Sequence, residues 1–90
     1  MFVCLMAHDK AGALDVRMEN RPAHVDYLKS TDHVHMAGPL IDTDGGMCGS
    51  MIVLDVPDLA AAAVCAANDP YAKAGLFESV TLTEWKKVIG

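Results

Sequence analysis

The chain has 90 residues, a formal net charge of −5 and a hydrophobic content of 52%. A chain of this length forms one domain, and we assign residues 1–90 to it. The hydrophobic content is too high for a disordered protein, yet no apolar run approaches the roughly 20 residues of a membrane-spanning helix. Basic residues cluster only at Lys86-Lys87, which argues against nucleic acid or an anionic membrane surface as a partner.

The N-terminal segment and the cysteines both indicate a cytoplasmic protein. Residues 1–6 lack a basic flank and lead directly to His8, which is typical of a buried strand and not of a signal peptide. The three cysteines are odd in number and show no CxxC spacing. We therefore expect free thiols in a reducing compartment.

The first third of the chain predicts a strand followed by an interrupted helix. Residues 2–7 are apolar and rich in β-formers, which is typical of a buried strand. Residues 13–30 have helical periodicity, with Arg17 away from the inward face. The residues expected on the inward face are Leu14, Met18, Val25 and Leu28. Pro22 removes a backbone donor, so we expect two helical pieces, the second capped by Asn20.

The rest of the chain predicts three more strands and a second helix. The expected strands are residues 34–37 (ended by Gly38-Pro39), residues 49–56 and residues 76–87. A turn-rich loop over residues 42–46 separates the first two of these strands. Pro57-Asp58 begins a helix over residues 59–67, and Asn68-Asp69-Pro70 ends it. The side chains expected to point inward from the last strand are Val80, Leu82 and Trp85.

The order strand, helix, strand, strand, helix, strand predicts an α+β domain of the ferredoxin-like βαββαβ type. Such a domain has a four-stranded antiparallel sheet with both helices on one face. A chain this hydrophobic leaves apolar residues on the uncovered face of the sheet. Two copies that face each other would bury them, so we predict a homodimer.

This topology also brings distant residues to one end of the sheet. The first strand ends there, the third strand begins there and the second helix finishes there. The residues predicted to gather at this end are Asp9, His24, Pro39, Ser50 and Asp69.

A histidine beside a carboxylate is the usual construction of a general base, because the carboxylate fixes the tautomer and stabilises the imidazolium. His24 and Asp69 fit this role. A structural interpretation stays open, in which Asp69 only caps the turn at Pro70 and His24 only packs. Tyr71, next to Asp69, either packs or lines a pocket, and Ser50 either begins its strand or donates a hydrogen bond to a bound oxygen.

Metal and phosphate chemistry are less well supported. His33 and His35 share a strand face, but His8 lies at the other edge, and no HxxxH or HExxH spacing occurs. Gly45-Gly46 is not followed by a helix, so it predicts a hairpin and not a phosphate cradle. We expect no metal and no cofactor, and full function in the presence of a chelator.

These segments together resemble the YCII (YciI-like) family over nearly the whole chain. The matching segments are His8-Asp9-Lys10, Arg21-Pro22-Ala23-His24, Ala37-Gly38-Pro39, Gly49-Ser50, Asn68-Asp69-Pro70-Tyr71 and Ala74-Gly75. The resemblance implies the dimeric α/β-barrel type of the ferredoxin-like fold and a His-Asp dyad on His24 and Asp69. His8 itself and the short connection over residues 31–33 depart from the family pattern.

A characterised branch of that family dehydrochlorinates a chlorinated hydroxyhydroquinone without a cofactor and yields a hydroxybenzoquinone. The resemblance therefore implies a lyase for a small aromatic substrate of the 5-chlorohydroxyhydroquinone type, with His24 as general base. His8, Asp9 and Ser50 would hold ring oxygens. The substrate-binding residues expected in all are His8, Asp9, Pro39, Ser50 and Tyr71. The alternative is a non-catalytic small-molecule binding or accessory protein of the same family.

Overall fold

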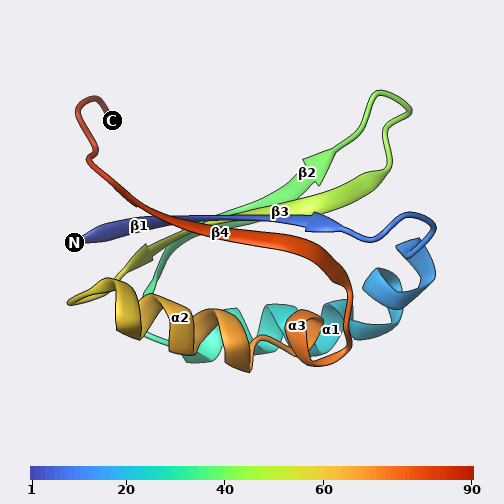
Figure 1. Cartoon of the computed structure of the whole chain (residues 1–90), viewed down its shortest axis with the longest axis horizontal. Helices are drawn as coiled ribbons and strands as arrows, with labels where there is room; N and C mark the ends of the chain where they lie inside the picture. Colours follow the sequence, from blue (N-terminus) through green and yellow to red (C-terminus); the bar gives the residue numbers. More distant parts are fainter.

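The computed structural model describes residues 1–90 as one layer of sheet and one layer of helices (Figure 1). The elements in chain order are β1 (Phe2–Asp9), α1 (Leu14–Ser30), β2 (Val34–Ile41), β3 (Met47–Asp55), α2 (Leu59–Asn68), α3 (Pro70–Lys73) and β4 (Phe77–Trp85). The strands form one antiparallel sheet in the order β2-β3-β1-β4, and all helices cover the same face. This confirms the predicted ferredoxin-like fold. None of the helices has the length and apolarity needed to cross a membrane.

Alternation along β1 divides the sheet into a covered face and an open face. Val3, Leu5 and Ala7 are buried against the helices, because successive strand residues point to opposite sides. Their register partners on β3, which include Leu54 and Ser50, share the covered face. A slip of one residue would turn the buried set toward the open face, so core burial fixes the register.

Helix α1 is continuous through Pro22, so the prediction of two helical pieces is wrong. Pro22 cannot donate to the carbonyl of Met18, but both residues are exposed and water can replace the missing donor. Asn20 is not a cap. Its side-chain amide donates to the carbonyl of Val16 at 2.9 Å, within the helix.

The inward face of α1 also differs from the prediction. Arg17 and His24 are the buried residues of this helix, whereas Leu14 and Met18 are exposed. Polar side chains occupy the inward positions because each has a carboxylate partner on another element. The face of α1 that meets the sheet therefore carries buried polar side chains, and not only apolar ones.

Strand β2 continues past the predicted end at Ala37, and Gly38 and Pro39 lie within it. It is an edge strand, where a proline removes no essential ladder donor. Pro39 is the register partner of Ser50, which faces the helices. The longer strand thus places Pro39 on the covered side of the sheet.

The predicted inward residues of β4 divide between the two faces. Val80 and Leu82 pair with helix-facing residues of β1, but Trp85 pairs with Phe2 and lies on the open face. An odd separation between Leu82 and Trp85 requires this, because side chains alternate with a period of two residues. The inward prediction for Trp85 is therefore wrong.

Helix α2 begins and ends close to the predicted residues. Asp58 is its N-cap and accepts from the backbone N–H of Ala61 at 2.8 Å, while Pro57 precedes the cap. Asp69 ends α2 and also caps the start of α3. A single acidic residue thus joins these two helices, and it lies next to the inward face of α1.

Candidate active site

His24 and Asp69 meet between α1 and the junction of α2 with α3. His24 Nδ1 lies 2.8 Å from Oδ1 and 2.9 Å from Oδ2 of Asp69. Both residues are buried, with exposed fractions of 7% and 3%. The tautomer that fits this contact has Nδ1–H donating to the carboxylate and the lone pair on Nε2. No protein group bonds to Nε2, and His24 lines a cavity.

The same carboxylate caps a helix. Asp69 Oδ1 accepts from the backbone N–H of Tyr71 at 2.9 Å, and Pro70 occupies the first position of α3. Capping and contact with His24 are therefore not alternatives at this residue. The cap holds the carboxylate in place, and the carboxylate in turn orients the imidazole. A role in catalysis stays a prediction.

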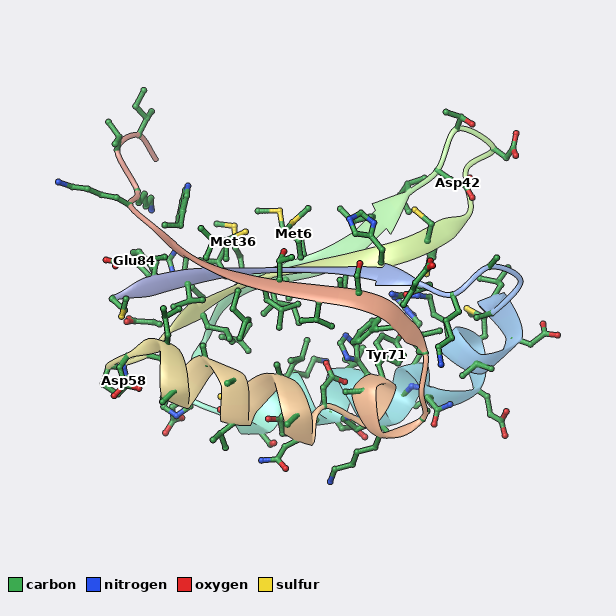
Figure 2. The ribbon with its side chains drawn as sticks, in the orientation of Figure 1. Met6, Met36, Asp42, Asp58, Tyr71 and Glu84 are labelled. Atoms are coloured by element: carbon green, nitrogen blue, oxygen red, sulfur yellow. The ribbon has the colours of Figure 1, made fainter.

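Tyr71 lies in the space between the sheet and the helices, as Figure 2 shows. Its ring stacks on His24 with 3.8 Å between centroids and 15° between planes. The Arg17 guanidinium carbon lies 4.6 Å from the centroid of the Tyr71 ring, within range of a cation–π contact. The Tyr71 side chain is fully buried, and its hydroxyl has no hydrogen-bond partner.

Burial is the main cause that raises the pKa of Tyr71 and of Tyr27, the two tyrosines of the chain. For Tyr71, Arg17 and Arg21 lower the pKa, but burial prevails. Because the folded state holds these protons more tightly, the unfolding free energy should fall as the pH rises from about 10 through the raised pKa values. Phenolate absorbance should therefore develop at higher pH in native protein than in urea. Coincident titrations in the two states would contradict this.

Arg17 forms a buried ion pair with the other predicted acid. Its Nε donates to Asp9 Oδ2 at 2.7 Å and its Nη2 donates to Asp9 Oδ1 at 3.0 Å. Nη2 also donates to Ser50 Oγ at 2.9 Å. Burial works to lower the pKa of Arg17, but the hydrogen bond and charge of Asp9 outweigh it and raise the pKa. Arg17 is thus a fixed cation beside Ser50.

A cavity of about 420 Å³ opens beside His24. It lies between the inward face of α1 and the edge strand β2, with Ser50 of β3 also in its wall. The apolar part of the wall consists of Val25, Leu28, Val34, Ala37 and Pro39. The volume is typical of a small-molecule site and admits a single substituted ring.

The predicted binding residues fall into two groups. Pro39, Ser50 and Tyr71 line the cavity beside His24. Asp9 lies outside the lining, and it holds Arg17 instead of facing a ligand.

His8 is placed differently from the prediction. It is exposed and follows the helix-facing Ala7 on β1, so its side chain points to the open face of the sheet. It does not line the cavity, and a direct contact with a ligand there is not supported. Neighbouring strand residues cannot both face the helices, and the expected role of His8 took no account of this two-residue period.

Arg17 and Arg21 are among the cavity residues that were not predicted to belong to the site, as is Lys29. Arg17 and Arg21 precede His24 by seven and three residues, which places these two arginines and His24 on one face of a helix. That spacing was visible in the sequence. The predicted break at Pro22 concealed it, because it separated Arg17 from the helix that carries His24.

Comparisons with known proteins identify relatives over nearly the whole chain. The family model described as YCII-related domain matches residues 1–86. Protein YciI of Escherichia coli O6:H1 is 34% identical over an alignment of 97 positions, which covers 98% of this chain and 99% of that protein. An uncharacterized protein of Haemophilus influenzae is 32% identical with the same coverage.

Two solved structures also match nearly the whole chain. The 5-chloro-2-hydroxyhydroquinone dehydrochlorinase (TftG) of Burkholderia phenoliruptrix, in complex with 2,5-dihydroxybenzoquinone, superposes with a TM-score of 0.89. It is 29% identical, and the match covers 96% of this chain and 94% of that one. An antibiotic biosynthesis monooxygenase matches with a TM-score of 0.57 at 14% identity, over 96% of this chain and 98% of that one. The latter likeness extends to the fold alone.

The fold and the site define a class of small ferredoxin-like domains with a buried His-carboxylate pair beside a ligand-sized cavity. Within this class, the match over residues 1–86 and the two relatives above 30% identity are decisive. The chain belongs to the YCII-related family, which confirms the predicted resemblance.

Proposed function

We propose that this protein is a cofactor-independent lyase that removes HCl from a chlorinated polyhydroxybenzene of the 5-chlorohydroxyhydroquinone type. One observation carries the proposal. His24 Nδ1 contacts both carboxylate oxygens of Asp69, while Nε2 is left without a protein partner at a cavity of about 420 Å³. A base of this construction, next to space for one ring, suits proton removal from a ring hydroxyl.

The structural neighbour supports this choice of substrate. TftG is named for its action on 5-chloro-2-hydroxyhydroquinone and was solved with 2,5-dihydroxybenzoquinone, and it superposes over 96% of this chain. The relatives named YciI and uncharacterized protein carry no activity in their names. The choice among reactions therefore depends on the cavity, and not on sequence relatives.

The proposed reaction moves two protons. Nε2 of His24 takes the proton of the hydroxyl next to the C–Cl bond and returns it to the carbon that carries chlorine, which gives a keto tautomer. Nε2 then takes the proton of the hydroxyl para to that carbonyl. The O–H electrons form a second carbonyl, the ring double bond shifts, and the C–Cl electrons leave with chloride. One HCl is lost, a hydroxybenzoquinone is formed, and no external oxidant is needed.

Neighbouring groups fit the demands of these steps. Asp69 stabilises the imidazolium each time His24 holds a proton. Ser50 Oγ accepts from Arg17, so its own hydroxyl hydrogen is free to donate to a ring oxygen. Negative charge that develops on that oxygen would be stabilised by the hydrogen bond and by the Arg17 cation behind it.

A chloride-release assay tests the proposal directly. Purified protein should release chloride from 5-chlorohydroxyhydroquinone, and hydroxyhydroquinone without chlorine should give no quinone under the same anaerobic conditions. Absence of chloride release across a panel of chlorinated polyhydroxybenzenes, with ligand binding retained, would instead favour the non-catalytic binding protein.

We also propose that two copies associate through the open face of the sheet. Met6 and Met36 point away from the helices in Figure 2, and Met36, Met51 and Trp85 are exposed by 50%, 38% and 38%. Phe2 stands between His35 and Trp85, with ring centroids 4.8 Å and 6.0 Å away. An apolar surface of this kind on a small domain is stabilised when it is covered, and a second copy presents the same surface.

Sedimentation should therefore show a dimer at micromolar concentration, with twice the chain mass of 9.6 kDa. Met36→Lys should shift the protein toward monomer, because it places a charge in the buried interface. The matched control is Val64→Lys, which changes a residue of α2 that is 61% exposed on the helical side. A wild-type protein that remains monomeric, or equal shifts in both variants, would contradict this arrangement.

A further inference from the structure

The wall of the cavity has an unusual charge for this protein. The chain carries a net charge of −5, yet the side chains that line the cavity include Arg17, Arg21 and Lys29 and no aspartate or glutamate. Charges of one sign in a concave, partly apolar site raise the local concentration of ligands of opposite sign. The cavity is therefore a cationic region on an acidic domain.

These cations are not equally available to a ligand. Arg17 is buried and its charge is matched by Asp9. Arg21 and Lys29 are exposed, and neither forms an ion pair or a side-chain hydrogen bond. Even Asp26, which lies on the same helix between them, makes no ion pair with either of them. Two free cations thus remain at the cavity.

The positions of the free cations relative to the base restrict how a ligand can bind. Arg21 precedes His24 by three residues and so lies about one turn, or about 5 Å, along α1. Lys29 lies five residues past His24, about 7 Å further along the helix. A ring held beside His24 can therefore place a substituent against Arg21 while a hydroxyl faces Nε2.

We infer that the cavity binds an organic anion, a single ring with an ionised oxygen substituent that binds Arg21 and is attracted by Lys29. The hydroxybenzoquinone product of the proposed reaction is such an anion once its acidic enol has ionised. This inference rests on the proposed function, since it takes the cavity beside His24 as the substrate site. The anionic group is a carboxylate or an acidic enol of a hydroxyquinone, and both present the charged oxygen that a guanidinium binds best. A neutral ring of equal size forms no ion pair with Arg21 or Lys29.

Binding calorimetry with matched probes tests the inference without any need for turnover. The affinity for salicylate, compared with that for salicylamide, tests recognition of a carboxylate. The affinity for 2,5-dihydroxybenzoquinone, compared with that for hydroquinone, tests recognition of an acidic enol. In the wild type, at least one anion should bind about 10-fold or more tightly than its neutral match. Arg21→Gln should weaken anion binding by about 10-fold, since it removes a charge-assisted hydrogen bond, and Lys29→Gln by about 3-fold. Arg21→Lys should restore part of the loss.

The control is Lys86→Gln, which removes a positive charge at an exposed residue outside the cavity and should leave anion binding unchanged. Equal affinity for anion and neutral match, absence of anion binding at millimolar concentration, or equal losses in Arg21→Gln and Lys86→Gln would overturn the inference. His24→Ala separates this inference from the proposed function, because it should retain anion binding while it loses turnover. If anions bind through Arg21 but no substrate is ever turned over, the proposed lyase activity fails and the anion site stands.

Discussion

His24→Ala should reduce the rate of chloride release by about 10² to 10⁴-fold, the usual contribution of a positioned acid-base group. The imidazole is the only group in the cavity with a free basic nitrogen and a carboxylate behind it. Initial rates at saturating substrate measure this loss. The thermal unfolding midpoint and the far-UV circular dichroism of the variant show that the fold is retained.

Asp69→Asn gives a matched test of the second member of the pair. An asparagine keeps an oxygen that can cap α3, as the Asp69 carboxylate does for the N–H of Tyr71, but removes the charge that stabilises the imidazolium. We expect a smaller but clear loss of rate, and a double variant little worse than His24→Ala, because the two residues act as one unit. His33→Ala, at an exposed residue, is the control. Near-normal turnover in His24→Ala would leave only the capping interpretation of Asp69.

Asp9→Asn should lower the free energy of unfolding by about 3–5 kcal/mol, which is a large share of the total stability of a small domain. It leaves the guanidinium of Arg17, which is 2% exposed, without its bidentate carboxylate. Urea unfolding at neutral pH measures the loss. Turnover should fall as well, because Arg17 then loses its fixed position beside Ser50.

Two controls separate the buried ion pair from a general charge effect. Asp55→Asn removes a carboxylate that lies 3.8 Å from the N-terminal amine and is 65% exposed, so it should cost less than about 1 kcal/mol. Replacement of both partners, as in Asp9→Leu with Arg17→Met, should recover much of the stability, since no unpaired charge stays buried. Equal losses for Asp9→Asn and Asp55→Asn would contradict the view that the Arg17 pair is structural.

The fold and the meeting of His24 with Asp69 were predictable from the sequence, because strand order places the helix that carries His24 beside the end of α2. The inward face of α1 could not be predicted correctly from the sequence. That face is set by the ion pair of Arg17 with Asp9, a contact between elements that no local pattern encodes. The apolar Leu14 and Met18 misled the prediction because they satisfy the helical period but remain exposed.

The positions of the prolines and the two-residue period of the strands account for the other differences between the predicted and the observed structure. Pro22 lies inside α1, and Pro39 lies inside β2. The missing backbone donor costs little free energy at either place, because Pro22 is exposed and β2 is an edge strand. The prediction that His8 holds a ring oxygen follows from the family resemblance and the lyase hypothesis built on it. The direction of its side chain depends on register with β3 and β4, which topology without register does not provide.

The most direct test of the central claim follows chloride and quinone together in one anaerobic sample. Wild-type protein and 5-chlorohydroxyhydroquinone are mixed under argon. The chloride concentration, read with an electrode, and the absorbance of the quinone are recorded at the same time. We predict one chloride for each quinone formed, at a rate that His24→Ala reduces by about 10²-fold or more. Quinone without chloride, or chloride at the same rate with wild type and His24→Ala, would contradict the assignment of His24 as the base of a dehydrochlorinase.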